Sequence, residues 1–176
     1  MIPLGILAGK KEVYKNVALN IEPQLSLGAI YTGAMANITK GYRFVSSSDP
    51  DGLSKRVTIT PVDIGGGNYG IVISIDLGSE KNINRIGLIS GLTSDGSLGS
   101  DTPNSDTAAT LPLYDVIGFY GYKNDGVTTV TIPSPSNLNY LFNQIDFTEV
   151  KIRYLSIYLY KNDTFYISGI EAWGTN

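Results

Sequence analysis

The chain of 176 residues contains neither histidine nor cysteine. It therefore cannot form Ser-His-Asp or Cys-His catalytic sites, the usual zinc sites or a disulfide framework. Oxygen ligands for Ca²⁺ or Mg²⁺ are the metal chemistry that remains. Charged residues are also few, at 16%, and the net charge is −3. We expect no nucleic-acid partner, because phosphate binding needs clustered Lys and Arg.

Long apolar runs are absent as well. The N-terminal stretch MIPLGILAGKK is apolar first and basic second, which is the reverse of a signal peptide. Its apolar part is too short to span a bilayer. We therefore expect no signal peptide, no membrane insertion and a chain that folds in a cytoplasm. The hydrophobic content of 42% is sufficient for one packed domain.

Strand patterns dominate the remaining sequence. Ile71, Ile73, Ile75 and Leu77 recur at every second position, which is typical of a β-strand with one buried face. Turn residues separate further strand patterns at 83–90, 114–122, 127–132, 150–160 and 165–173, with weaker ones at 42–47 and 56–64. This series predicts an all-β jelly-roll β-sandwich. Pro61 is expected at an edge or a bulge.

Gly65, Gly67 and Gly70 stand at the G-x-G-x-x-G spacing of dinucleotide-binding loops. That fingerprint follows a strand and opens a helix, whereas these glycines precede the strand pattern at 71–77. We interpret them as a loop that needs positive φ, and we expect no cofactor.

The segment 90–112 is long, small and polar, and it carries three aspartates but no basic residue. A loop of this length in a compact domain is usually functional or mobile. It is an insertion without a role, a loop that contacts a partner, or a cation site with oxygen ligands. The sequence leaves these alternatives open.

Three stretches, in this order, resemble discoidin-type domains, also called coagulation-factor C-terminal-type or galactose-binding-like domains. They are GIVISIDLGSEKNINRIGLIS, YDVIGFYGYKNDG and VKIRYLSIYLYKNDTFYISGIEAWG. The resemblance covers about residues 25–174, and it implies an eight-stranded jelly-roll sandwich whose termini lie close together. We therefore predict a galactose-binding-like domain at 25–176, preceded by an apolar leader at 1–24.

The resemblance also bears on metal binding. Family members usually hold a structural Ca²⁺ with acidic or amide side chains in a turn, and a Glu near the last strand completes the site. In this sequence Lys40 and Tyr42 stand in that turn, and Gly169 stands where the Glu would be. Because Lys40 removes a ligand and adds a like charge, we expect no metal.

Sugar-binding members of the family use His, Arg, Asn and exposed aromatic residues on their loops. Histidine is absent here, and the usual opening Trp is replaced near Phe44, so we do not expect the usual galactoside pocket. The candidate glycan loops are those around Phe44 and Tyr69, the segment 90–112, and the segment 161–166, which ends at Tyr166. Trp173 matches an aromatic residue of the family's closing strand and is expected in the core.

Tyr154, Tyr158 and Tyr160 alternate with apolar residues on the strand pattern at 150–160. In a two-layer sandwich these tyrosines face outward. They are covered by a loop or the leader, form a protein interface, or stack on sugar rings. We predict that they are an interface or a glycan platform.

Catalysis is not expected. A carboxylate-only mechanism needs two acids that meet in a cleft, and the sequence shows no pairing among the candidates at 76, 115, 146, 149 and 171. We therefore predict that the chain is not an enzyme.

The leader provides the last clue. Its apolar residues must pack on their own sandwich or on another subunit, and the interface residues we predict are Ile2, Leu4, Ile6 and Leu7. The string MIPLGIL resembles leaders of bacteriophage tail and virion-associated proteins. We therefore predict a non-enzymatic bacteriophage virion protein of the tail, baseplate, fibre or capsid decoration, assembled in the host cytoplasm. Its expected partners are other virion proteins, further copies of itself and a host-surface glycan. The alternative is a carbohydrate-binding module for cell-surface or polymeric glycans.

Overall fold

The structure, a computed structural model, describes residues 13–26, 29–41, 56–90, 103–104, 115–136 and 140–176. These residues form strands and one short 3-10 helix, with no α-helix among them. The elements in chain order are β1 (Lys15–Asn16), β2 (Gln24–Ser26), β3 (Ala29–Thr32), η1 (Met35–Thr39), β4 (Val57–Pro61), β5 (Gly70–Ile89), β6 (Val116–Tyr122), β7 (Thr129–Thr131), β8 (Phe142–Tyr160), β9 (Phe165–Ile167) and β10 (Gly169–Thr175). The predicted all-β class is confirmed. The strand expected at 42–47 lies outside the described residues.

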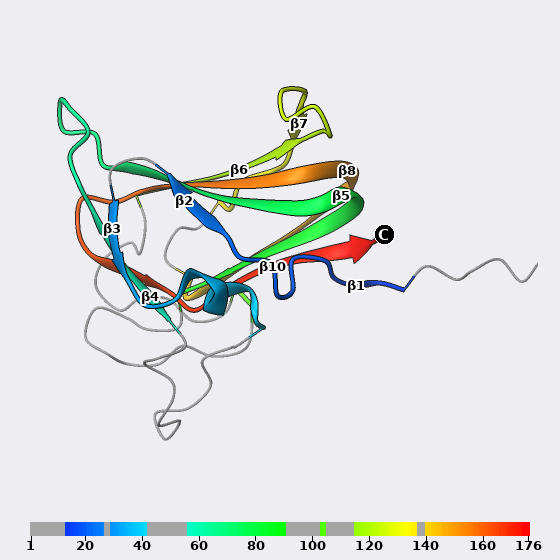
Figure 1. The fold of residues 1–176 in the computed structure, drawn as a ribbon, viewed down its shortest axis with the longest axis horizontal. Coiled ribbons are helices and arrows are strands. Elements are labelled where there is room, and N and C mark those ends of the chain that lie inside the picture. Colours follow the sequence, from blue (N-terminus) through cyan, green and yellow to red (C-terminus); the bar gives the residue numbers. More distant parts are fainter. Residues whose placement is uncertain (1–12, 27–28, 42–55, 91–102, 105–114, 137–139) are drawn as a thin grey trace, which may run out of the picture.

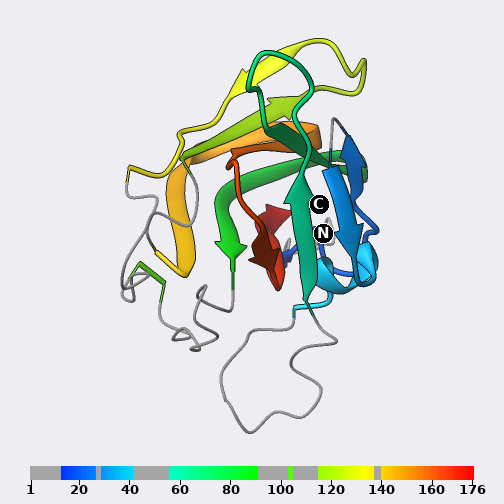
Figure 2. The ribbon, with the colours of Figure 1, turned by 90° about the vertical axis from the view of Figure 1, so that its left-hand side faces the viewer.

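Two antiparallel sheets make up the sandwich. The larger has the order β1-β10-β5-β8-β6-β7, with β2 also paired to β5, and the smaller has the order β3-β4-β9. In Figure 2, β3 and β4 lie side by side on the near side of the molecule. Pro61, expected at an edge or a bulge, instead ends the middle strand of the small sheet. It pairs with Ala29 beyond the end of β9, so its missing N–H removes no bond to β9.

The long strands β5 and β8 bend together. They pair from Gly70 to Ile89, but their register shifts between Asp76 and Lys81. At the bend Gly78 has a φ of 78°, and its N–H donates to Asp76 Oδ1 at 2.9 Å. Figure 1 shows β5 running to the right and turning back there. The sequence predicted two strands, and the structure keeps both halves paired with one partner.

Residues of both sheets share one hydrophobic core. Ile71, Ile73 and Ile75 of β5 and Leu155 and Ile157 of β8 are fully buried, as the period-two pattern predicted. β-Branched side chains suit a pleated surface, and each buried one contributes about 1.5–3 kcal/mol to folding. Because successive strand residues alternate, the residues between these face outward.

The described part of the predicted leader, residues 13–24, packs on the sandwich. β1 pairs with β10, and Val17 and Ala18 belong to the core. The Asn16 side chain holds this segment, because its Oδ1 accepts the N–H groups of Ala18 and Ala172 at 3.1 Å each. Figure 1 shows β1 beside β10, which carries the C-terminus. The first and last strands of the described chain are therefore neighbours, and the first of them lies in the segment that the family resemblance left outside the domain.

The loop before β5 explains the glycine spacing. Gly65, Gly66 and Gly67 all have positive φ, at 123°, 68° and 80°. The Asp63 carboxylate accepts the N–H groups of Gly65, Gly67 and Asn68 at 2.8 to 3.1 Å. A carboxylate of the chain itself thus takes the donors that a phosphate would need. The chain then enters a strand rather than a helix, as we predicted.

Candidate functional site

Five tyrosines lie on the outward face of β6 and β8, and we call this surface the tyrosine face. They are Tyr120, Tyr122, Tyr154, Tyr158 and Tyr160. Tyr122 stands directly opposite Tyr154 in the pairing of the two strands, so their Cβ atoms are about 5 Å apart. Tyr120 is 49% exposed, and the other four are half-buried. The alternation of each strand places all five on one side.

Two of these tyrosine rings lie over glycines. A Cβ built on Gly70 would come within 2.8 Å of Tyr158 Cε2, and one built on Gly118 within 2.9 Å of Tyr120 Cε2. The Tyr158 ring thus reaches from β8 to β5 and the Tyr120 ring extends along β6, and each covers a position without a side chain, a known way for aromatic residues to protect strand glycines. The outer end of each ring therefore occupies the space that a side chain would fill at the glycine.

Small polar residues surround the tyrosines. The register of the neighbouring strands places on the same face Gln24 and Ser26 of β2, Val72 and Ser74 of β5, Ser156 of β8, and Thr129 and Thr131 of β7. The hydroxyls of Ser74 and Ser156 lie 3.3 Å apart. The face thus combines aromatic rings with hydroxyl and amide groups.

An ion pair borders the Tyr154 end of the tyrosine face. Arg153 donates from Nε and Nη2 to the two oxygens of Asp76, at 2.9 and 3.0 Å. Its guanidinium lies 4.8 Å from the centre of the Tyr154 ring. The hydrogen bond from Arg153 holds the pKa of Asp76 below its usual value, and the N–H of Gly78 lowers it further. The pair joins β8 to the bend of β5.

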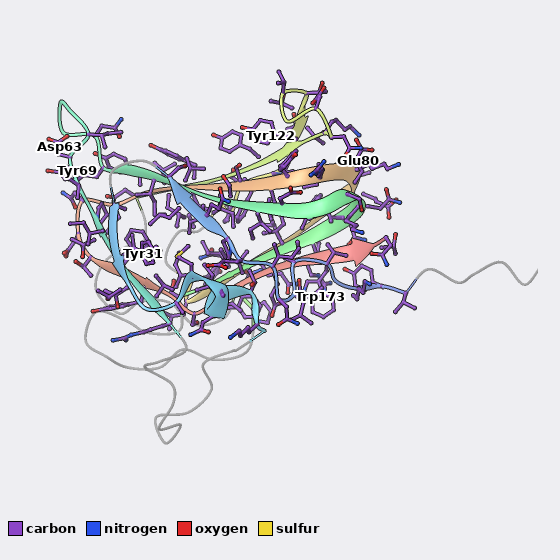
Figure 3. The ribbon with its side chains drawn as sticks, viewed as in Figure 1. Tyr31, Asp63, Tyr69, Glu80, Tyr122 and Trp173 are labelled. Atoms are coloured by element: carbon purple, nitrogen blue, oxygen red, sulfur yellow. The ribbon has the colours of Figure 1, made fainter. Side chains whose placement is uncertain are left out.

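The glycine loop borders the opposite end. The Tyr160 hydroxyl donates to the carbonyl of Gly67 at 2.9 Å, and Lys161 Nζ lies 3.8 Å from Asp115 Oδ1. In Figure 3, Asp63 of the glycine loop lies at the far left of the upper strands, and Tyr122 lies well to the right of it. Structured contacts thus fix the tyrosine face at both ends.

The sequence placed Tyr154, Tyr158 and Tyr160 on one outward face, and the structure does the same. It missed Tyr120 and Tyr122. Their signal was present in YDVIGFYGY, because the alternate residues of β6 are buried and the two tyrosines therefore face outward.

The predicted glycan loops are only partly described. Tyr166 lies on β9 in the smaller sheet, where the Arg56 guanidinium stands 4.2 Å from its ring centre. Tyr69 is half-buried just before β5, near Asp63 in Figure 3. The structure therefore places these two tyrosines on elements other than β6 and β8. Phe44, nearly all of 90–112, and the leader residues Ile2, Leu4, Ile6 and Leu7 lie outside the described residues.

Four of the five carboxylates considered for catalysis have separate partners. Asp146 pairs with Arg85, and Asp76 and Asp115 lie beside the cations described above. Glu171 is buried and accepts the Trp173 Nε1 hydrogen at 2.8 Å. Across the ranges that the structure describes, no three acidic side chains gather to hold a metal ion.

Trp173 lies outside the core, contrary to the expectation from the family resemblance. Its neighbour Ala172 is fully buried, so alternation along β10 turns Trp173 outward. There it is half-buried and stacks on Tyr14 with 5.9 Å between ring centres. The Tyr14 hydroxyl donates to Asn84 Oδ1 at 2.9 Å, which anchors the stack.

A pocket of about 250 Å³ lies at the start of β8, at the other end of this strand from the tyrosine face. It is lined by Asn104, Pro135, Ser136, Tyr140, Asn143, Gln144 and Ile145. Asn104 makes two hydrogen bonds with the backbone of Gln144, at 2.8 and 2.9 Å. Asn143 donates from Nδ2 to the Tyr140 carbonyl, and its buried Oδ1 has no partner among the described residues.

The fold is shared with solved carbohydrate-binding modules. Chitosan-binding module 1 of a chitosanase/glucanase from Paenibacillus sp. IK-5 is similar with a TM-score of 0.57 and 15% identity, covering 91% of this chain and 99% of that one. A fucose-binding module of Streptococcus pneumoniae, SpX-3, gives 0.57 and 16%, covering 92% and 99%. The lectin domain of lectinolysin, complexed with Lewis B antigen, gives 0.59 and 14%, covering 92% and 98%.

These likenesses confirm the galactose-binding-like β-sandwich fold that the sequence resemblance implied. At these identities they show the fold alone. No protein-family model matches the chain, and no curated protein matches it in sequence. Among the residues that the structure describes, no helix is long and apolar enough to cross a membrane.

Proposed function

We propose that this chain is a non-catalytic carbohydrate-binding module whose tyrosine face holds the sugar. The observation that carries the proposal is this face, on which the rings of Tyr120 and Tyr158 cover glycine positions. The fold supports it, because the similar solved modules are named for binding chitosan or fucose, and one is complexed with Lewis B antigen.

The chemistry of the tyrosine face suits a sugar ring. A pyranose has an apolar face of C–H groups and a rim of hydroxyls. A flat tyrosine ring covers the C–H face, and its hydroxyl, together with those of Ser74 and Ser156, can exchange hydrogen bonds with the rim. Apolar area removed from water in this way contributes about 25 cal/mol per Å².

The virion role was the leading prediction from sequence, and the comparisons favour its alternative. The similar structures reported above are sugar-binding modules, and the leader that carried the phage resemblance lies outside the described residues. A phage location, homo-oligomers and virion partners therefore stay predictions. They are compatible with a sugar-binding face, but nothing in the described residues favours them.

A polysaccharide screen tests the proposed function. The full chain is applied to immobilised plant, microbial and animal glycans, beside the variants Tyr158→Ala and Tyr120→Ala. We expect the wild type to bind at least one glycan and each variant to lose about tenfold or more in affinity, which corresponds to about 1.4 kcal/mol. Tyr31→Ala is the matched control, because Tyr31 is 46% exposed on the smaller sheet and should leave binding unchanged. A wild type that binds no glycan contradicts the proposal, and so do variants that bind as well as the wild type.

A further inference from the structure

We infer that the tyrosine face takes the interior of an uncharged, extended saccharide chain, rather than a terminal sugar or a charged polymer. This inference rests on the proposed function and names the ligand class of the same surface. It follows from the length, the flatness and the charge of the face.

The length of the tyrosine face exceeds one sugar. Tyr154 and Tyr160 stand six positions apart on β8, and a strand rises about 3.3 Å per residue, so the row is about 20 Å long. Tyr120 and Tyr122 add a second, parallel row on β6, about 4.8 Å away. A strip of this shape is several sugar rings long and little more than one ring wide. It therefore suits consecutive units of a chain that lies along β8.

The flatness of the face favours side-on contact. A site that selects one terminal sugar usually surrounds it in a concave pocket. Here the Tyr158 ring covers Gly70 and the Tyr120 ring covers Gly118, so glycine positions that could have been hollows are filled by rings. The pocket described above is lined by residues at the other end of β8. The tyrosine face therefore offers a surface without hollows at these positions, which several consecutive sugar units of one chain can contact.

The charge of the face is neutralised within the protein. At one end Arg153 binds both oxygens of Asp76, and at the other Lys161 lies beside Asp115. Between these pairs the neighbouring residues are hydroxyl, amide and aliphatic side chains. A charged polymer finds no unpaired counter-charge among them, and the net charge of −3 repels anionic polymers further. A neutral saccharide chain needs no counter-charge on the face and is not repelled by the net charge of the protein.

The same features favour a saccharide over a protein partner. Protein interfaces obtain most of their energy from large anchors that fill desolvated hollows. On the tyrosine face the aliphatic side chains are Val72 and Val116, both near the glycine-loop end. The central positions carry Ser74 and Ser156 between flat rings. Hydroxyl groups that alternate with aromatic rings complement a polyhydroxylated saccharide chain better than they complement the large side-chain anchors of a protein partner.

A panel of polymers tests the charge prediction. The probes are neutral β-glucan, xylan, galactomannan and chitin, anionic polygalacturonate and alginate, and cationic chitosan. We expect binding to at least one neutral polymer and at least about tenfold weaker binding to every charged one. Raising the ionic strength to about 1 M, where the Debye length is about 3 Å, should change the affinity by less than about twofold. Binding only to charged polymers, or affinity lost in salt, overturns the inference.

An oligosaccharide series of the bound neutral polymer tests the length prediction. We expect the affinity measured by calorimetry to rise from the monosaccharide to the hexasaccharide by about tenfold or more. Tyr154→Ala and Tyr160→Ala, at the two ends of the row, should each weaken hexasaccharide binding, whereas the control Tyr31→Ala should not. A monosaccharide that binds as tightly as the hexasaccharide overturns the inference while the proposed function stands. A wild type that binds no glycan at all removes the proposed function itself.

Discussion

At the scale of single residues, the tyrosine face depends on glycines as much as on tyrosines. Gly70 and Gly118 leave the sheet surface bare, and the rings of Tyr158 and Tyr120 lie in the space that side chains would fill. A β-carbon at either position would come within 2.9 Å of ring atoms, so the ring would have to move off the glycine. The place that each ring occupies is therefore left open by a residue that carries no side chain.

We predict that Gly70→Ala weakens glycan binding about as much as Tyr158→Ala. The new Cβ would stand 2.5 Å from Tyr158 Oη, so the ring must swing outward. Tyr158 is half-buried at the surface and has room to move, and the unfolding free energy should change by less than about 1 kcal/mol, the low end of overpacking costs. Calorimetric titration and thermal melts of the same samples check both parts.

Tyr158→Phe is the control for the Gly70 variant. It keeps the ring over Gly70 and removes only the hydroxyl, so most of the affinity should remain. If Gly70→Ala binds as the wild type does, the position of the Tyr158 ring over Gly70 has no role in recognition.

At the scale of elements, the bend shared by β5 and β8 organises the larger sheet. It lets the two halves of β5 pair with the two halves of β8, while β2 and β10 pair with the separate halves of β5. The positive φ of Gly78 and the Asp76 hydrogen bonds form the bend. Arg153 binds Asp76 across the two strands, so one ion pair connects the bend to the tyrosine face.

We predict that part of the stability is lost in acid through Asp76. The hydrogen bond from Arg153 holds the folded pKa of Asp76 below its ordinary value of 3.8, so the folded chain binds this proton less readily than the unfolded chain. The contribution is present above the unfolded pKa and is lost as the pH falls through the folded pKa. Because both partners are partly exposed, at 30% and 45%, it should amount to less than about 1 kcal/mol. Urea unfolding at a series of pH values from neutral into acid measures it.

Arg153→Met tests the cause of this pH dependence. It removes the hydrogen bond that contributes most to the lowered pKa of Asp76, so the variant should lose less stability on acidification than the wild type. Asp125, whose pKa is lowered by Thr128, keeps its contribution in both proteins. An unchanged acid slope in the variant would assign the effect to other carboxylates.

The strands differ in how well their positions can be predicted from hydrophobic periodicity in the sequence. The first half of β5 and the second half of β8 have buried residues at every second position, so periodicity predicts them. The first half of β8 is rich in polar residues such as Asn143, Gln144 and Asp146, and no period emerges. β1, β2 and β3 have two to four residues each, which is too short for a pattern. These short strands form only by pairing with strands that are distant in the sequence.

The candidate site likewise has features that could be predicted from the sequence and features that could not. The tyrosine rows could be predicted, because each tyrosine alternates with a core residue on its own strand. The rings over Gly70 and Gly118 and the bond between Asp76 and Arg153, 77 residues apart, could not be predicted. They depend on which strands become neighbours, and no local pattern in the sequence encodes that choice.

At the scale of the whole molecule, the first and last described strands close the sandwich together. β1 adds to the edge of β10, and β10 in turn pairs with β5. Val17 and Ala18, next to β1, are nearly or fully buried at 8% and 0% exposure. The segment 13–24, which the sequence assigned to a leader, therefore contributes to the core.

We predict that removing residues 13–19 destabilises the domain. Compared with a chain that starts at Val13, a chain that starts at Asn20 lacks β1, the buried Val17 and Ala18, and the Asn16 side chain that bonds to Ala172. Loss of a buried Val costs about 1.5–3 kcal/mol, and each lost hydrogen bond about 1 kcal/mol. Denaturant unfolding should therefore show a loss of about 3–5 kcal/mol. Equal stability of the two chains would place the start of the folding unit at or after residue 20, in line with the boundary that the family resemblance alone implied.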